Sequence, residues 1–197
     1  FLQPTDDMHN YLYLTYDNAL VCYVLKALAK LLDRPELMDE ADKTRQAIYE
    51  HCVKEQNHKR FFAWSVDLNG HYDIYDEPPG SLLLLPFYGF CEAEDPIWQN
   101  TAAMIRDESY ALSFAGHPIA EIGCKHAPHP WILSICNSLL SDHADSALLH
   151  LSRTPLDNGV ACESVNEDTG LCETGEAFAT CAGFLSYALY TVCSPVD

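Results

Sequence analysis

Two acids stand directly before two prolines, which interrupt regular secondary structure, in the stretch Tyr75-Asp76-Glu77-Pro78-Pro79-Gly80-Ser81-Leu82-Leu83-Leu84-Leu85-Pro86. Proline fixes its own φ angle and disfavours helix in the residue before it, so the prolines predict a stiff turn after Asp76 and Glu77. Ser81 is a favourable N-cap, and the leucines after it predict a helix over residues 81–90. Two interpretations of the acids stay open, catalytic groups or solvated loop residues, since loops collect both.

Composition sets the class of partner. The 197 residues suit one domain, and 48% of them are hydrophobic, which is enough for a sizeable core. The formal charge of −18 repels phosphate backbones and anionic membranes, so we expect no nucleic-acid and no membrane partner. No apolar run approaches the roughly 20 residues that span a bilayer. The chain opens on Phe1 without an initiator methionine or a signal peptide, so we expect a fragment or a chain trimmed at its front.

The cysteines predict a reducing compartment. Their number is odd, their spacing is wide and no Cys-x-x-Cys occurs, which argues against a disulfide framework and a zinc knuckle. Three of them lie inside apolar helical patterns, where a free thiol acts as a small hydrophobe. We therefore expect a cytoplasmic protein with nine free thiols: Cys22, Cys52, Cys91, Cys124, Cys136, Cys162, Cys172, Cys181 and Cys193.

The rest of the chain alternates helical patterns with long loops. Helices are predicted over residues 17–32, 35–53, 81–90, from 95, 131–140, 142–152 and 175–192, the last apolar almost all round and therefore expected to be buried. A small hairpin is predicted from strands at residues 61–67 and 72–75 around Asn69-Gly70. The count of about seven or eight helices, mostly paired, predicts a mainly α fold over residues 1–197 as a single domain. We expect helical hairpins forming roughly half to two-thirds of an (α/α)6 barrel, with a small β-hairpin in the loops.

Three loops carry acids among aromatic residues. Residues 4–16 contain Asp6 and Asp7 beside three tyrosines, residues 73–80 contain Asp76 and Glu77, and residues 161–174 contain Glu163. A glycosidase needs one acid to protonate the leaving oxygen, one base to activate water and rings to hold the sugar. The alternative for Glu163 is an ordinary exposed surface residue.

Four stretches, in order, resemble glycoside hydrolase family 125. Pro4-Thr5-Asp6-Asp7 is similar to the family's Pro-Ser-Asp-Asp. The stretch from Asp76 to Pro86 is similar to the family's Asp-Asp-Ala-Asn-Val-Pro-Ser-Leu-Leu-x-Leu-Pro, and Tyr75 stands at the position of the first Asp. Ile122-Gly123-Cys124-Lys125-His126-Ala127-Pro128 resembles its Ile-Gly-Ser-x-His-Thr-Pro, and Cys162-Glu163-Ser164 its His-Glu-Ser. The chain departs from the family at Cys162 and after Thr174, where Gly175 stands in place of an arginine.

The resemblance implies the C-terminal part of a metal-independent, exo-acting α-1,6-mannosidase with an (α/α)6 barrel. Asp76 would be the general acid and Glu163 the general base of an inverting hydrolysis, with their carboxyl groups roughly 6.5–9.5 Å apart. Glu77 competes for the acid role if the register slips by one. Cofactors and metals are not expected, and the substrate would be an oligosaccharide or glycoside, an α-mannoside first and a related hexoside next. Predicted sugar contacts are Asp6, Asp7, Tyr13, Glu77, His126 and Trp131.

Other interpretations stay open. His126 and His129 with Glu121 could suggest a metal site, although Pro128 and Pro130 break the helix that would align them. Trp98 lies in a helical pattern typical of core. The runner-up function is a non-catalytic helical toroid fragment that binds carbohydrate or protein, and a lyase or epimerase is weaker. The missing N-terminal part of the same protein is a further expected partner.

Overall fold

The computed structural model describes residues 7–194, which fall into two compact units. Unit 1 comprises Phe1–Asp76 and Leu82–Ala103, and unit 2 comprises Glu77–Ser81 and Met104–Asp197. Asp6, one of the predicted sugar contacts, lies outside the described residues. Among the helices of residues 7–194, none has both the length and the apolar character needed to cross a bilayer.

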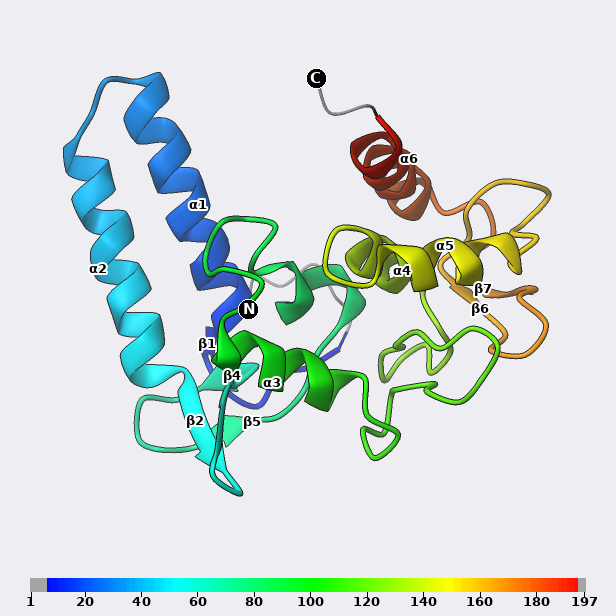
Figure 1. Cartoon of the computed structure of the whole chain (residues 1–197), viewed down its shortest axis with the longest axis horizontal. Coiled ribbons are helices and arrows are strands. Elements are labelled where there is room, and N and C mark those ends of the chain that lie inside the picture. The colour runs from blue at the N-terminus through cyan, green and yellow to red at the C-terminus, as the bar shows by residue number, and fades with distance from the viewer. Residues whose placement is uncertain (1–6, 195–197) are drawn as a thin grey trace. The chain divides into compact units, whose positions relative to one another are not determined.

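Unit 1 contains a long helical hairpin. Helix α1 (Thr15–Leu31) packs along α2 (Glu36–His51), as Figure 1 shows. Small side chains, among them Ala19, Cys22 and Ala41, are buried in this hairpin and let the helices approach closely. Asp33, at a φ of 51°, turns the chain between them. Both helices confirm the prediction from apolar spacing.

Short strands follow the hairpin. β2 (Val53–Gln56) pairs with β3 (Lys59–Phe62), and β4 (Ser65–Val66) lies between β1 (Tyr13–Leu14) and β5 (Tyr72–Asp73). The hairpin predicted around Asn69-Gly70 is confirmed by the pairing of β4 with β5. The strand predicted over residues 61–67 is instead divided, because its first two residues complete β3 and Ser65 begins β4.

The helix predicted over residues 81–90 is wrong. Only a 3-10 turn, η2 (Leu82–Leu84), forms there, and a second one, η1 (Pro78–Gly80), precedes it in unit 2. Pro86 has no N–H to donate to the Leu82 carbonyl, so an α-helical turn cannot close. That carbonyl accepts instead from the Leu85 N–H at 3.3 Å and from the Trp98 indole at 3.1 Å. Trp98, on α3 (Pro96–Ile105), is buried core as predicted.

Unit 2 is centred on α4 (Ile132–Leu139), all of whose residues are buried. It packs against α5 (Ala144–Ser152) and α6 (Ala179–Cys193), and β6 (Ser164–Val165) pairs with β7 (Cys172–Thr174) (Figure 1). The strands β6 and β7 were not predicted.

Helix α6 corrects the expectation that it is buried. It begins four residues later than predicted, because β7 and a turn occupy residues 172–177. Cys181, Leu185 and Ala188 are buried, whereas Tyr187 is 50% and Tyr190 is 74% exposed. The described residues therefore hold six α-helices rather than seven or eight. The mainly α class is confirmed, and the barrel and the single domain stay predictions.

Candidate active site

Glu163 is anchored through its backbone from two sides. Its N–H donates to the carbonyls of Thr174 and Gly175, both at 3.1 Å, and its carbonyl accepts from the Ile132 N–H at 3.0 Å. The first turn of α4 and the end of β7 thus fix where the side chain starts. The residue is half-buried.

A hydroxyl holds the carboxylate of Glu163. The Thr174 hydroxyl donates to Oε2 at 2.8 Å, and the Ser164 and Thr174 hydroxyl oxygens lie 2.6 Å apart. Ser164 is fully buried and directly faces Thr174 across the β6–β7 pair. The three side chains form a continuous hydrogen-bonded row that sequence reasoning did not identify.

Gly175 and Cys181 complete the surroundings of Glu163. A Cβ atom at Gly175 would lie 2.5 Å from the Cβ of Glu163, so only glycine fits there. Burial, and then the negative charge of Glu163, raises the pKa of the Cys181 thiol to about 12. Cys181 is therefore a neutral thiol at physiological pH, and it places no second negative charge beside Glu163.

Asp76 is buried at the end of the first stretch of unit 1. Its Oδ1 accepts from the Leu82 N–H at 2.8 Å, so the turn through the two prolines folds back to hold it. Tyr16 is a neighbour that sequence reasoning did not assign to the site. Burial, then the hydrogen bond with Tyr88, raises the pKa of the Tyr16 phenol, and Asp76 adds to this rise whenever its carboxyl is ionised. Tyr16 therefore keeps its proton.

The two predicted catalytic acids belong to different units. Asp76 closes the first stretch of unit 1, whereas Glu163 lies in unit 2 with Glu77. Glu77 is as deeply buried as Asp76 and immediately precedes η1. The separation of roughly 6.5–9.5 Å between the carboxyl groups stays a prediction, as does the choice of acid.

The N-terminal loop contacts the turn that carries Asp76. The Tyr75 hydroxyl donates to Oδ2 of Asp7 at 3.3 Å, and the Asn10 amide donates to Oδ2 of Asp73 at 2.6 Å. Tyr13, 44% exposed, pairs with Val66 in the three-stranded sheet. Two of the three acidic loops are thus brought together within unit 1.

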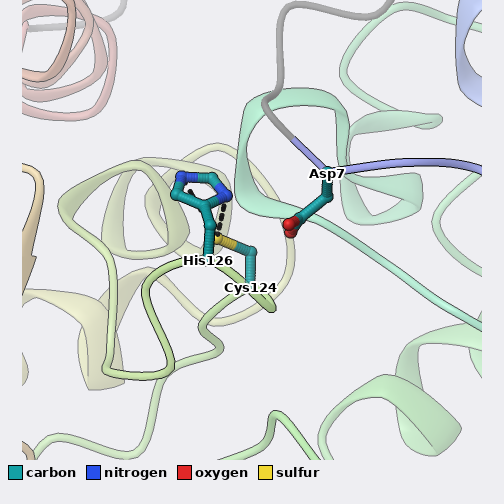
Figure 2. Close-up of side chains that lie close together, drawn as sticks. All are labelled: Asp7, Cys124 and His126. Carbon is teal, nitrogen blue, oxygen red and sulfur yellow. Dashed lines mark hydrogen bonds between the residues drawn. The ribbon is translucent and has the colours of Figure 1, made fainter.

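The loop after residue 121 holds the other predicted sugar contacts. His126 is exposed, and its Nδ1 lies 3.3 Å from the sulfur of Cys124 (Figure 2). Trp131 is buried, donates its indole N–H to the Ala127 carbonyl at 3.0 Å and meets the His126 ring edge-on. That burial leaves little ring face for a sugar, and stacking by Trp131 stays a prediction.

The residues of the alternative metal site have separate partners. Oε2 of Glu121 accepts from the hydroxyls of Ser134 and Ser138, and its Oε1 contacts His150 at 2.8 Å. His129 pairs with Glu167 at 3.0 Å. Glu121 therefore ties α4 to α5 rather than meeting the two histidines.

Comparison with known proteins gives a family match over nearly the whole chain. Residues 1–188 match the family described as metal-independent alpha-mannosidase (GH125). The meiotically up-regulated gene 157 protein of Schizosaccharomyces pombe is 28% identical over 163 residues, which cover 76% of this chain and 32% of that protein.

Two solved structures share the fold. One is a metal-independent α mannosidase of Streptococcus pneumoniae in a non-productive complex with α-1,6-mannobiose, with a TM-score of 0.77 and 22% identity over 96% of this chain and 49% of the other. The second is a bacterial glucoamylase bound to acarbose, with a TM-score of 0.65 and 15% identity over 90% of this chain and 33% of the other. The chain thus spans about half of the mannosidase and about a third of the other two proteins.

Proposed function

This chain belongs to the metal-independent alpha-mannosidase family GH125, and we propose that it carries the catalytic acids of an exo-acting, inverting glycosidase. Asp76 is the general acid and Glu163 the general base. The substrate is an oligosaccharide or glycoside ending in an α-mannoside, or in a related hexoside. The family match over residues 1–188, which includes both acids, carries the proposal.

The chemistry uses one water molecule. Glu163 takes a proton from the water molecule, and the oxygen of that water forms a bond to the anomeric carbon. The glycosidic bond breaks at the same centre, and the leaving oxygen takes the proton of Asp76. The burial of Asp76 supports this role, because an acid shielded from water keeps its proton more readily. Attack from the face opposite the leaving group inverts the anomeric configuration, so an α-mannoside yields β-mannose first.

Further groups would surround the sugar. Asp7 and Tyr13 in unit 1 and Glu77, His126 and Trp131 in unit 2 are proposed contacts, with Asp6 beyond the described residues. Helical hairpins from outside residues 1–197 are a proposed partner, since the relatives are longer. The nine cysteines occur as free thiols, which supports a reducing, cytoplasmic location as part of the proposal.

The test is turnover of α-1,6-mannobiose and of nitrophenyl glycosides by the longest natural form of the protein. Asp76→Asn and Glu163→Gln are each expected to lower kcat by roughly 10²–10⁴-fold, because each removes one proton-transfer group. Glu77→Gln tests the register: if Asp76 is the acid, losing the Glu77 sugar contact should raise KM, while kcat stays well above that of Asp76→Asn. Proton NMR of the first product reports its anomeric configuration.

A wild-type rate from Asp76→Asn or Glu163→Gln would contradict the assignment of that residue. Failure of the wild type to cleave any of the glycosides would contradict the function. Retained mannobiose binding without turnover in the wild type would favour the non-catalytic binding protein instead.

A further inference from the structure

The hydrogen-bonded row beside Glu163 has a defined direction. Ionised Glu163 can only accept, so Thr174 must donate its one hydroxyl hydrogen to Oε2. The 2.6 Å contact between Ser164 and Thr174 then requires Ser164 to be the donor. The row therefore runs from Ser164 through Thr174 to one oxygen of Glu163.

The row of hydroxyls donates a hydrogen bond to Oε2 of Glu163 and not to Oε1. Among residues 7–194, the side-chain hydrogen bond of Glu163 goes to Oε2, from Thr174. Thr174 is a rigid donor, because a β-branched side chain on a strand has few χ1 rotamers. Its hydroxyl is also fixed from behind by Ser164, which is fully buried. The carboxylate is therefore held in one orientation by groups of its own hairpin.

We propose that Thr174 is a positioning residue that selects Oε1 of Glu163 as the oxygen that takes the proton from water, with Ser164 fixing the Thr174 hydroxyl. This inference rests on the proposed function. Oε2 is occupied by a donor, so it is the poorer acceptor for a water proton. Much of the rate enhancement by a general base comes from holding it in the right orientation, because the reacting atoms must already lie within reach.

The deciding comparison is Thr174→Val against Thr174→Ser. Valine keeps the shape of threonine without the hydroxyl, whereas serine keeps the hydroxyl without the methyl group. We expect Thr174→Val to lower kcat roughly 10–100-fold, the size of loss that a misplaced catalytic group causes, while KM changes little. Thr174→Ser should stay within about threefold of wild type, because the donor to Oε2 is retained. Ser164→Ala should fall between the two, because Thr174 remains but loses its support.

A matched control comes from the same hairpin. Thr169 is exposed between β6 and β7 and donates to the Asn166 side chain. Thr169→Val makes the same chemical change away from Glu163 and should leave kcat unchanged. Melting temperatures of all variants separate lost activity from lost folding, and Ser164→Ala answers the question if Thr174→Val does not fold.

Different outcomes reject the two proposals separately. If Glu163→Gln is inactive but Thr174→Val keeps the wild-type kcat, only the positioning role of Thr174 fails. If Thr174→Ser is as slow as Thr174→Val, the hydroxyl that serine retains is not enough to orient Glu163, and the role also fails. If Glu163→Gln turns over normally, the proposed function fails. Crystal structures of the variants need no activity: an unmoved Glu163 carboxylate in Thr174→Val would overturn the inference.

Discussion

Gly175 lies directly against Glu163, a predicted catalytic side chain. Its φ of +61° is in the left-handed region, and a Cβ there would lie 2.5 Å from Cβ and 3.3 Å from Oε2 of Glu163. The first of these distances is well inside van der Waals contact. Glycine is therefore required at this position for two reasons: the backbone has a positive φ, and Glu163 occupies the space that a Cβ atom would need.

Gly175→Ala is expected to displace Glu163. The left-handed backbone alone costs about 1–2 kcal/mol for a residue with a Cβ, and the contact with Glu163 adds to it. We expect a lower melting temperature and a fall in kcat of at least roughly tenfold, because Glu163, the proposed base, moves from its position. Thermal unfolding and turnover of an α-mannoside measure the two effects.

Gly89→Ala is the matched control, because Gly89 has a φ of +64° and an added Cβ there would meet no atom within 4 Å. It carries the backbone cost alone and should leave kcat unchanged. Equal losses of stability and unchanged kcat in both variants would mean that the contact with Glu163 has no effect.

At the scale of elements, an ion pair ties the segment after α3 to the link between α4 and α5. Arg106 donates to Oδ1 of Asp142 at 2.9 Å and to the Ser141 hydroxyl at 3.1 Å. Burial alone would raise the pKa of Asp142, but Arg106, together with His143, outweighs it and lowers that pKa. The pair is partly exposed, with side-chain exposures of 20% and 27%.

The ion pair predicts a pH-dependent contribution to stability. A lowered folded-state pKa means that the stabilisation is fully present above the unfolded pKa of about 3.9 and is lost as pH falls through the folded value. Asp142→Asn should therefore lower the free energy of unfolding at pH 7, by at most about 1 kcal/mol for a partly exposed pair. The difference from wild type should shrink when the pH is lowered to about 3, below the unfolded value.

Urea unfolding at the two pH values measures the difference. Glu94→Gln, a change at an exposed acid, controls for the loss of one negative charge. A difference between Asp142→Asn and wild type that persists undiminished at low pH would assign the effect to packing or helix capping instead.

Elements with a long apolar period could be predicted from the sequence, and elements fixed by distant partners could not. Helices α1 and α2 follow their patterns closely. Residues 81–90 look helical locally, but Pro86 and the capture of the Leu82 carbonyl by Trp98 decide against it. The β2–β3 hairpin was missed although Asn57, which favours a positive φ, marks its turn.

For the candidate site, family-like motifs name Asp76 and Glu163, whose roles stay predictions, but not the groups that contact them. Thr174 could not be paired with Ser164 from spacing, because β7 carries an extra residue, Glu173, against β6 and shifts the register. The link from Glu121 to α4 and α5 joins residues 29 positions apart, beyond the reach of a local pattern.

At the scale of the whole molecule, each unit exposes an apolar helix face. In unit 1, Val21, Val24 and Leu31 on α1 are 46%, 43% and 79% exposed, at helical spacing. In unit 2, Tyr187 and Tyr190 on α6 are exposed. Exposed apolar side chains at helical spacing are typical of a helix face that packs against a partner. Since the chain spans 49% of the solved mannosidase, we propose that helical hairpins from outside residues 1–197 cover these faces.

Val24→Glu tests whether other helices cover the exposed face of α1. The variant is compared with wild type in two forms of the protein, residues 1–197 alone and the longest natural form. In residues 1–197 alone, we expect less binding of the dye ANS and a change in stability within about 0.5 kcal/mol, because the side chain is at the surface. In the longer form the same charge would be buried against another helix and should lower the melting temperature clearly, since an unpaired buried charge is costly. Gln46→Glu adds a negative charge at an exposed polar position of α2 and should be neutral in both forms. If Val24→Glu is as harmless as Gln46→Glu in the longer form, no other part of the protein covers the face of α1.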